Sequence, residues 1–304
     1  MNPELLSHLS AVIHEATLRP FEVRTTTPVG GGCINQAYRL GGRDGRDFFV
    51  KLNDSKHHAI PSTWLRTGFM AEAAGLEAIV ATHAVRVPQP VVHGRCGAQS
   101  FLVLEYLDLQ TRGNAAQLGE QLAAMHRCTA KQFGFACDNF LGTTPQSNGW
   151  TADWVAFWRE RRLGYQLRLA AQNGCGGKLQ SLGERLMDAL PAFFEGYAPQ
   201  PSLLHGDLWG GNHGYLADGT PVIFDPAAYY GDRECDLAMT ELFGGYGADF
   251  YAAYRASWPL DTGYAARREL YNLYHILNHA NLFGGSYARQ AEQAMRKLLA
   301  ELER

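Results

Sequence analysis

Residues 205–212, HGDLWGGN, contain an aspartate and an asparagine separated by four residues in a glycine-rich stretch. A second aspartate, Asp225, follows thirteen residues after Asn212, at the end of the apolar run PVIFD. Phosphoryl transfer from ATP needs a carboxylate to receive the proton of the acceptor hydroxyl, and Mg²⁺ needs hard oxygen ligands. The spacing predicts Asp207 as the catalytic base and Asn212 and Asp225 as the magnesium ligands, and it matches the order of these groups in protein kinases.

The N-terminal part of the chain offers charged residues that could orient the phosphates of ATP. Lys51 lies in the middle of the strand-like run FFVKL, an uncommon place for a lysine unless its amine has a partner. Glu72 follows twenty-one residues later in a helical pattern, where it could pair with Lys51 and direct it toward the α- and β-phosphates. The alternative is that both residues are solvated surface charges.

Residues 29–35, VGGGCIN, form a glycine-rich turn between two strand-like runs. Without side chains, its backbone amides could approach phosphate oxygens closely, although three glycines are also frequent in ordinary hairpins. The predicted phosphate-binding glycines are Gly30, Gly31 and Gly32.

Residues 103–107, VLEYL, are predicted to form the hinge between two lobes. The backbone from Glu105 to Leu107 could pair with the edge of an adenine ring. The alternative is a buried strand that ends in a linker.

Hydrophobic periodicity indicates an α+β fold in which two lobes position these residues. Residues 4–17 and 64–83 have helical spacing, and glycine-rich turns separate short β-branched or aromatic runs at 21–28, 37–40, 47–52, 87–94 and 100–107. Residues 1–107 therefore predict a small N-terminal lobe, a sheet of about five strands with one inserted helix.

Residues 108–304 are predicted to be mainly helical. Short strands are expected only beside the HGDLWGGN motif, at 202–205, 213–216 and 221–225. The polar loops at the junction of the lobes suggest a ligand-binding cleft. Helices are expected around 118–125, 154–161, 182–190, 236–243, 264–283 and 287–302.

Composition excludes several classes of protein. The chain has 304 residues, a formal net charge of −3, no long apolar run and no basic N-terminal leader. Nucleic acid and membranes are therefore not expected as partners, and a cytoplasmic location is expected. Its six cysteines are scattered singly, which argues for free thiols and against a structural zinc site.

Several longer blocks closely resemble the fructosamine kinase (ketosamine-3-kinase) family, a branch of the protein-kinase-like superfamily. The resemblance spans nearly the whole chain and implies a two-lobed kinase fold that uses ATP and Mg²⁺. It also implies phosphorylation of the O3 hydroxyl of a ketosamine, a small molecule or a glycated amine or protein, in deglycation. The blocks are LLHGDLWGGN, FDPAAYYGDRECDLAMTELFGG, GGGCIN, AEAAGLEAI and NFLGTTPQSNGWTADWVAFWRERRL.

The chain also departs from the protein-kinase pattern. Gly206 stands where an arginine often precedes the base, Pro226 replaces the aromatic residue after the metal-binding aspartate, and no A-P-E segment follows. These departures favour a small acceptor and a site that forms without phosphorylation.

Four further residues near the motif have expected roles. The ring of Trp209 could stack on the apolar face of the acceptor sugar, although a core tryptophan is an equal alternative. His205 is expected to brace the catalytic loop by a side-chain hydrogen bond. Asp236 is expected to cap the helix that it opens, and Asp232 to steady the catalytic loop.

Cys33 lies beside the three glycines, where positive potential would lower its pKa. It is either a redox-sensitive thiol that links two chains or an inert loop cysteine, so the expected state is a monomer or a redox-dependent homodimer.

Two rival functions remain. The first is a kinase for another alcohol, such as an aminoglycoside or choline, which would share the loop chemistry. The second is a catalytically inactive nucleotide-binding module. The inactive module is disfavoured because none of the five chemical positions is substituted.

Overall fold

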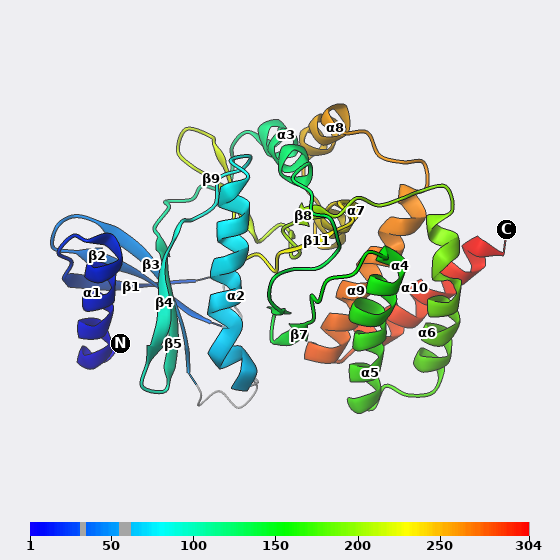
Figure 1. The fold of residues 1–304 in the computed structure, drawn as a ribbon, viewed down its shortest axis with the longest axis horizontal. Helices are drawn as coiled ribbons and strands as arrows, with labels where there is room; N and C mark the ends of the chain where they lie inside the picture. Colours follow the sequence, from blue (N-terminus) through cyan, green and yellow to red (C-terminus); the bar gives the residue numbers. More distant parts are fainter. Residues whose placement is uncertain (31–34, 55–61, 304) are drawn as a thin grey trace. The chain divides into compact units, whose positions relative to one another are not determined.

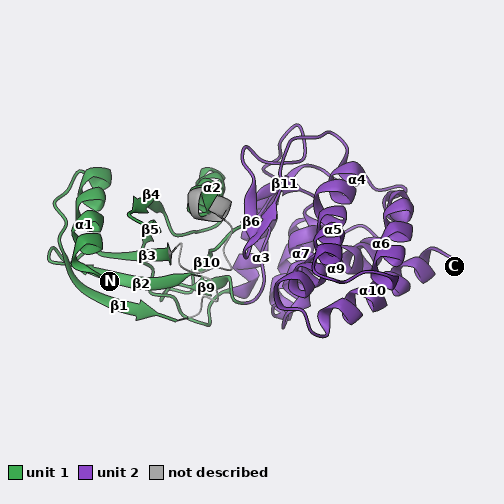
Figure 2. Ribbon diagram, turned by 90° about the horizontal axis from the view of Figure 1, so that it is seen from below, with its two compact units in different colours: residues 1–114, 211–227 green, residues 115–210, 228–304 purple. Residues whose placement is uncertain are grey.

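The computed structural model describes residues 1–30, 35–54 and 62–303. They form two compact units, residues 1–114 with 211–227 and residues 115–210 with 228–304 (Figure 2). The first unit therefore extends beyond residue 107, and it includes a segment that the sequence pattern had assigned to the C-terminal lobe. Figure 1 labels the helices and strands of both units.

The first unit is built on an antiparallel sheet of five strands in the order β1-β2-β3-β5-β4. One helix, α2 (Ser62–Ala81), follows β3 in the chain, so the predicted sheet with one inserted helix is confirmed. The strands are β1 (Val23–Val29), β2 (Gln36–Gly42), β3 (Asp47–Asp54), β4 (Pro90–Cys96) and β5 (Gln99–Glu105).

Helix α1 (Pro3–Thr17) packs against this sheet and shares its hydrophobic core (Figure 1). It begins at a proline, and the side chain of Asn2 caps it by accepting a hydrogen bond from Leu5 N at 2.8 Å. Its helical periodicity places apolar residues on one face, where they are removed from water. The buried residues of α1 that pack in the core are Leu5, Leu9 and Ile13.

The hairpin of β9 (His213–Tyr215) and β10 (Pro221–Ile223) belongs to the first unit through backbone pairing. Gln110 and Tyr215 exchange backbone hydrogen bonds of 2.7 and 3.0 Å. Ile223 N also donates to Arg86 O at 3.0 Å. These bonds join residues about a hundred positions apart in sequence, which explains why segment 211–227 lies with the first unit.

The second unit is mainly helical. A π-helical turn, η1 (Trp158–Leu163), joins α4 to α5, so the helix expected at 154–161 continues to residue 172. Helices α9 and α10 have the bounds that the periodicity predicts, whereas α8 was not expected. The helices are α3 (Ala115–His126), α4 (Trp154–Phe157), α5 (Gly164–Gln172), α6 (Lys178–Ala189), the 3₁₀ helix η2 (Leu190–Phe194), α7 (Glu234–Leu242), α8 (Ala248–Ser257), α9 (Tyr264–Phe283) and α10 (Tyr287–Leu302).

Two small antiparallel pairs complete the second unit. Strand β8 (Ser202–Leu204) pairs with β11 (Tyr229–Gly231), and β6 (Asn139–Leu141) pairs with β7 (Thr144–Gln146). The sequence pattern predicted only β8, because a strand of three residues is too short to show an alternation. None of the described helices has the length and apolar character needed to cross a bilayer.

Candidate nucleotide pocket and catalytic loop

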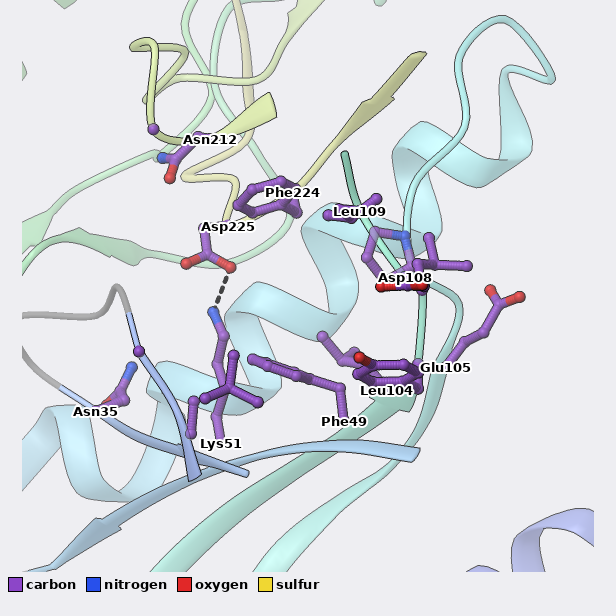
Figure 3. Close-up of a pocket in the computed structure, with 17 residues that line it drawn as sticks. Asn35, Phe49, Lys51, Leu104, Glu105, Asp108, Leu109, Asn212, Phe224 and Asp225 are labelled. Carbon is purple, nitrogen blue, oxygen red and sulfur yellow. Dashed lines mark hydrogen bonds and ion pairs between the residues drawn. The ribbon is translucent and has the colours of Figure 1, made fainter. Parts of the chain in front are cut away.

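A pocket of about 460 Å³ lies in the first unit (Figure 3). It has an apolar part, to which β3, β5 and the chain after β5 contribute, and a polar part around Lys51. The apolar residues include Val29, Ala37, Phe49, Leu104, Leu107 and Phe224, and the polar ones include Asn35, Lys51, Asp108, Asn212 and Asp225. An apolar cavity with a few converging polar groups is typical of a small-molecule site.

Lys51 is held in this pocket by two carboxylates. Its side chain projects from β3 and is only 5% exposed, and Nζ donates to Glu72 Oε1 at 2.7 Å and to Asp225 Oδ1 at 2.5 Å. Burial alone would lower the pKa of Lys51, but the charges of Asp225 and Glu72 outweigh it and raise this pKa above its usual value. Lys51 therefore remains an ammonium ion, and the predicted pairing with Glu72 is confirmed.

The pKa of Glu72 is raised by its burial on α2 and by the nearby charge of Asp225, against the opposing effect of Lys51. One ammonium group is thus paired with two carboxylates, which leaves an excess of negative charge around Lys51. A ligand that brings negative charge would compete with these carboxylates for Lys51, whereas a cation bound beside Asp225 would relieve the excess negative charge.

The β9–β10 hairpin brings Asn212 and Asp225 to the same pocket. The two residues flank the paired strands, and Phe224 N donates to Asn212 O at 3.0 Å. Asp225 has a φ of 60°, a left-handed conformation that is uncommon for residues other than glycine and is further disfavoured before Pro226. A backbone strained in this way persists only where the surrounding structure holds it, which is common at functional sites.

The donor set of the pocket suits Mg²⁺. Across the described ranges, no group of three or more His, Cys, Asp or Glu side chains could hold a metal ion. Mg²⁺ does not need such a cage, because it is usually held by one or two carboxylates together with phosphate oxygens and water. The amide of Asn212 and the carboxylate of Asp225 therefore fit this ion.

Glu105 and Leu107 both line the pocket, at the end of β5 and just beyond it. The N–H of Glu105 donates to Gln89 O at 2.9 Å, and its carboxylate pairs with Arg86 and accepts Gln89 N at 3.2 Å. Its side chain points away from the cavity (Figure 3). The Glu105 N–H is thus already used within the protein, so adenine pairing would depend on other backbone groups of this segment.

The predicted catalytic loop, residues 205–212, follows β8, and Asp236 holds its first two residues. The Asp236 carboxylate is buried and accepts hydrogen bonds from the backbone N–H of His205 at 2.7 Å and of Gly206 at 2.8 Å. His126 Nε2 lies 3.1 Å from the same carboxylate. The Asp207 N–H donates to His205 Nδ1 at 3.3 Å, so the expected brace by His205 is confirmed.

The expected roles of Asp232 and Asp236 were wrong, because the structure exchanges them. Helix α7 starts at Glu234, and Asp232 Oδ1 accepts the Glu234 N–H at 3.0 Å as a capping group would. Asp236 lies inside the first turn of α7 and turns toward the loop. The spacing of the two aspartates is compatible with either assignment, and only the long-range contact of Asp236 decides between them.

Trp209 is 38% exposed, so the alternative of a core tryptophan is wrong. Its backbone carbonyl accepts a hydrogen bond from Tyr246 OH at 3.3 Å. Like Asp207, Trp209 belongs to the second unit.

Of the three predicted phosphate-binding glycines, the structure describes Gly30. It lines the pocket, and a Cβ added there would meet nothing within 4 Å, so close packing does not require a glycine at this position. Gly31, Gly32 and Cys33 lie outside the described residues.

Two polar residues of the pocket were not anticipated from the sequence. Asn35 is the last residue of the predicted glycine-rich turn, and Asp108 directly follows the hinge. Their positions beside predicted ligand-binding segments were the available signal.

These features define a class of protein. An antiparallel-sheet unit with a buried lysine–glutamate pair, followed along the chain by a helical unit with an HGD loop, is the organisation of a protein-kinase-like phosphotransferase. The aminoglycoside phosphotransferase of the gentamicin–APH(2″)-IIa complex shares the fold, with a TM-score of 0.61 at 12% identity over 100% of this chain and 96% of that one.

The family follows from closer comparisons. The fructosamine kinase family model matches residues 5–301. A Synechocystis protein named as a probable ketoamine kinase is 46% identical over 94% of both chains, and the protein-ribulosamine 3-kinase of Arabidopsis thaliana is 45% identical over 86% of this chain and 79% of its own. A fructosamine-3-kinase crystal structure from Haemophilus somnus has a TM-score of 0.85 at 27% identity, with 96% of each chain covered.

The chain belongs to the fructosamine kinase family, and it is an ATP-dependent phosphotransferase with a ketosamine as its acceptor. The resemblance seen in the sequence blocks is thereby confirmed.

Proposed function

We propose that this protein transfers the γ-phosphoryl group of ATP to the O3 hydroxyl of a ketosamine, after which the adduct releases its amine. The observation that carries the proposal is the convergence of Lys51, Asn212 and Asp225 in one pocket of a fructosamine kinase family member, where Glu72 is paired with Lys51. The name of the Arabidopsis relative, protein-ribulosamine 3-kinase, supports ketosamines carried on proteins as acceptors.

Residues of the first unit bind the nucleotide in this proposal. Lys51, oriented by Glu72, contacts the α- and β-phosphates, while Asn212 and Asp225 hold Mg²⁺. When bound, the metal ion would neutralise charge that develops on the phosphates. Backbone groups from Glu105 to Leu107 contact the adenine, and the phosphate-binding glycines of this proposal are Gly30, Gly31 and Gly32.

Residues of the second unit act on the acceptor. Asp207 accepts the proton of the hydroxyl that attacks the γ-phosphate, and Trp209 stacks on the sugar. Asp236 keeps Asp207 in place, because it fixes the two backbone amides that precede it.

We also place the enzyme in the cytoplasm, as a monomer or as a homodimer linked through Cys33. Its formal net charge of −3 supports a protein that binds neither nucleic acid nor an anionic membrane surface.

A substrate panel tests the function. Fructosamines, ribulosamines, an aminoglycoside, choline and plain polyols are each incubated with ATP and Mg²⁺, and the site of phosphorylation is found by NMR. We expect turnover of ketosamines, with the phosphate on O3. Preference for the aminoglycoside or choline would overturn the acceptor assignment.

Asp207→Asn is the matched variant for this panel. It keeps the size of the side chain but cannot accept the proton, so we expect kcat to fall by about 10²–10⁴ while nucleotide binding is kept. If wild type and variant turn over ATP equally with every acceptor, Asp207 is not the base. If neither turns over any acceptor while both bind ADP, the protein is an inactive nucleotide-binding module.

A further inference from the structure

Asn35 and Asn53 form a side-chain pair beside the polar part of the pocket. Asn53 Nδ2 donates to Asn35 Oδ1 at 2.6 Å. Asn53 is only 4% exposed and lies on β3 two residues after Lys51. Alternate residues of a strand face the same side, so Asn53 approaches Asn35 from the face that also carries Lys51.

This pairing decides which end of the Asn35 amide remains for a ligand. A side-chain amide has one acceptor oxygen and one NH₂ donor group. The oxygen is engaged by Asn53, so the NH₂ group is the part presented to the pocket that Asn35 lines. In Figure 3 this nitrogen points in the direction in which Asp225 and Asn212 lie.

A neutral donor suits a phosphate at this place. The charged groups around Lys51 are one ammonium and two carboxylates, so an anionic ligand finds little net attraction from them alone. Hydrogen bonds from neutral N–H groups to phosphate oxygens strengthen the binding of a phosphate. Because such a donor carries no charge, it does not form a further ion pair with the two carboxylates.

We propose that the Asn35 amide donates a hydrogen bond to a phosphate oxygen of the bound nucleotide, and that Asn53 is the positioning residue that holds this amide with its nitrogen toward the ligand. The inference rests on the proposed function, since it requires a nucleotide in this pocket. It assigns a role to a side chain three residues after the last of the three glycines, in addition to the backbone amides predicted to bind phosphate there.

Titration calorimetry with Mg²⁺–ADP and with adenosine tests the contact. Adenosine lacks phosphates, so its affinity reports the folded apolar part of the pocket. We expect Asn35→Ala to weaken ADP binding about tenfold, as for the loss of one hydrogen bond to a charged group, and to leave adenosine affinity unchanged. Asn35→Asp keeps the acceptor for Asn53 but places a negative oxygen toward the phosphates, so its loss should be larger.

The positioning role of Asn53 is tested separately. Asn53→Leu is similar in size and uncharged but has no NH₂ donor, so the Asn35 amide loses the partner that holds its nitrogen toward the phosphates. We expect ADP affinity to fall several-fold, and the double variant with Asn35→Ala to bind ADP no more weakly than Asn35→Ala alone. Gln36→Ala is the matched control, because Gln36 is exposed and contacts Tyr38 instead.

Each outcome bears on a different statement. If wild type binds ADP no better than adenosine, the proposed nucleotide site fails. If wild type prefers ADP but Asn35→Ala retains that preference, or weakens adenosine equally, the Asn35 contact is refuted. If Asn53→Leu binds ADP as wild type does, or if its effect adds fully to that of Asn35→Ala, the positioning role is refuted.

Discussion

Asp236→Asn should loosen the catalytic loop without touching the pocket of the first unit. In the native protein, one carboxylate oxygen accepts the Gly206 N–H, and the other accepts the His205 N–H and lies 3.1 Å from His126 Nε2. Asparagine keeps one acceptor oxygen and turns an NH₂ group toward donors. At least one backbone amide then loses its partner in a fully buried place.

The magnitude follows from the bonds that are lost. Hydrogen bonds to a charged group contribute about 1.5–3 kcal/mol each, and an unsatisfied buried donor costs a similar amount. Loss of one or two such bonds predicts a decrease of about 2–4 kcal/mol in the free energy of unfolding. Since the loop carries Asp207, we expect kcat to fall at least tenfold, with a smaller change in KM for ATP.

Protonation of Asp236 at low pH should likewise lower the free energy of unfolding of the wild-type protein. Burial alone would raise the pKa of Asp236, but the hydrogen bond from His126 and the charges of His126 and His205 lower it. A carboxyl with a lowered pKa in the folded state stabilises the protein above its unfolded pKa of about 3.9, and this contribution is lost as the pH falls through the folded value.

Urea unfolding and steady-state kinetics measure both effects, with Asp218→Asn as the control. Asp218 is exposed and accepts the Thr220 N–H at 2.9 Å, a bond that asparagine can keep. If Asp236→Asn unfolds at the same urea concentration as Asp218→Asn and retains wild-type kcat, the carboxylate does not hold the loop.

Two further predictions concern stability. Burial, with the nearby Asp232, raises the pKa of Glu234 to about 7 against the opposing Arg267. Because this pKa exceeds the value of about 4.3 in the unfolded chain, the contribution of Glu234 to the free energy of unfolding is complete below that value and is lost as the pH rises through about 7. The urea concentration at the midpoint of unfolding should therefore fall between pH 5 and 8. Glu234→Gln should make this decrease with pH smaller. An equal slope in the variant would contradict this assignment. In Gly119→Ala, the new Cβ would lie 2.3 Å from a backbone carbonyl of α8, so we expect a loss of about 1–3 kcal/mol. Gly176→Ala, where a Cβ meets nothing within 4 Å, is its control, and equal melting temperatures of these two variants would refute the close packing of α3 on α8.

Sequence periodicity was sufficient for the long elements. Helices α1, α9 and α10 and the five-stranded sheet follow from patterns that repeat over many residues, so each contains its own signal. The pairing of Lys51 with Glu72 was also predictable, because a lysine in a buried strand needs a counter-charge and a carboxylate lay on the next helix.

Short elements and shared partners were not predictable in this way. Strand β11 has three residues and is defined by its pairing with β8, about twenty-five positions earlier. Asp225 pairs with Lys51 although the two residues are 174 positions apart in sequence. Asn53 on β3 bonds to Asn35, which directly precedes the neighbouring strand β2. In each case the local pattern is compatible with several arrangements.

The identities of the reactive groups, their order and the family likeness were thus properties of the chain itself. Tertiary structure decided which carboxylate steadies the loop, which residues share the lysine and which end of the Asn35 amide is bonded to Asn53. The physical reason is that a residue's type determines which bonds it can form, whereas the choice among possible partners is made when folding buries polar groups and leaves each of them few alternatives.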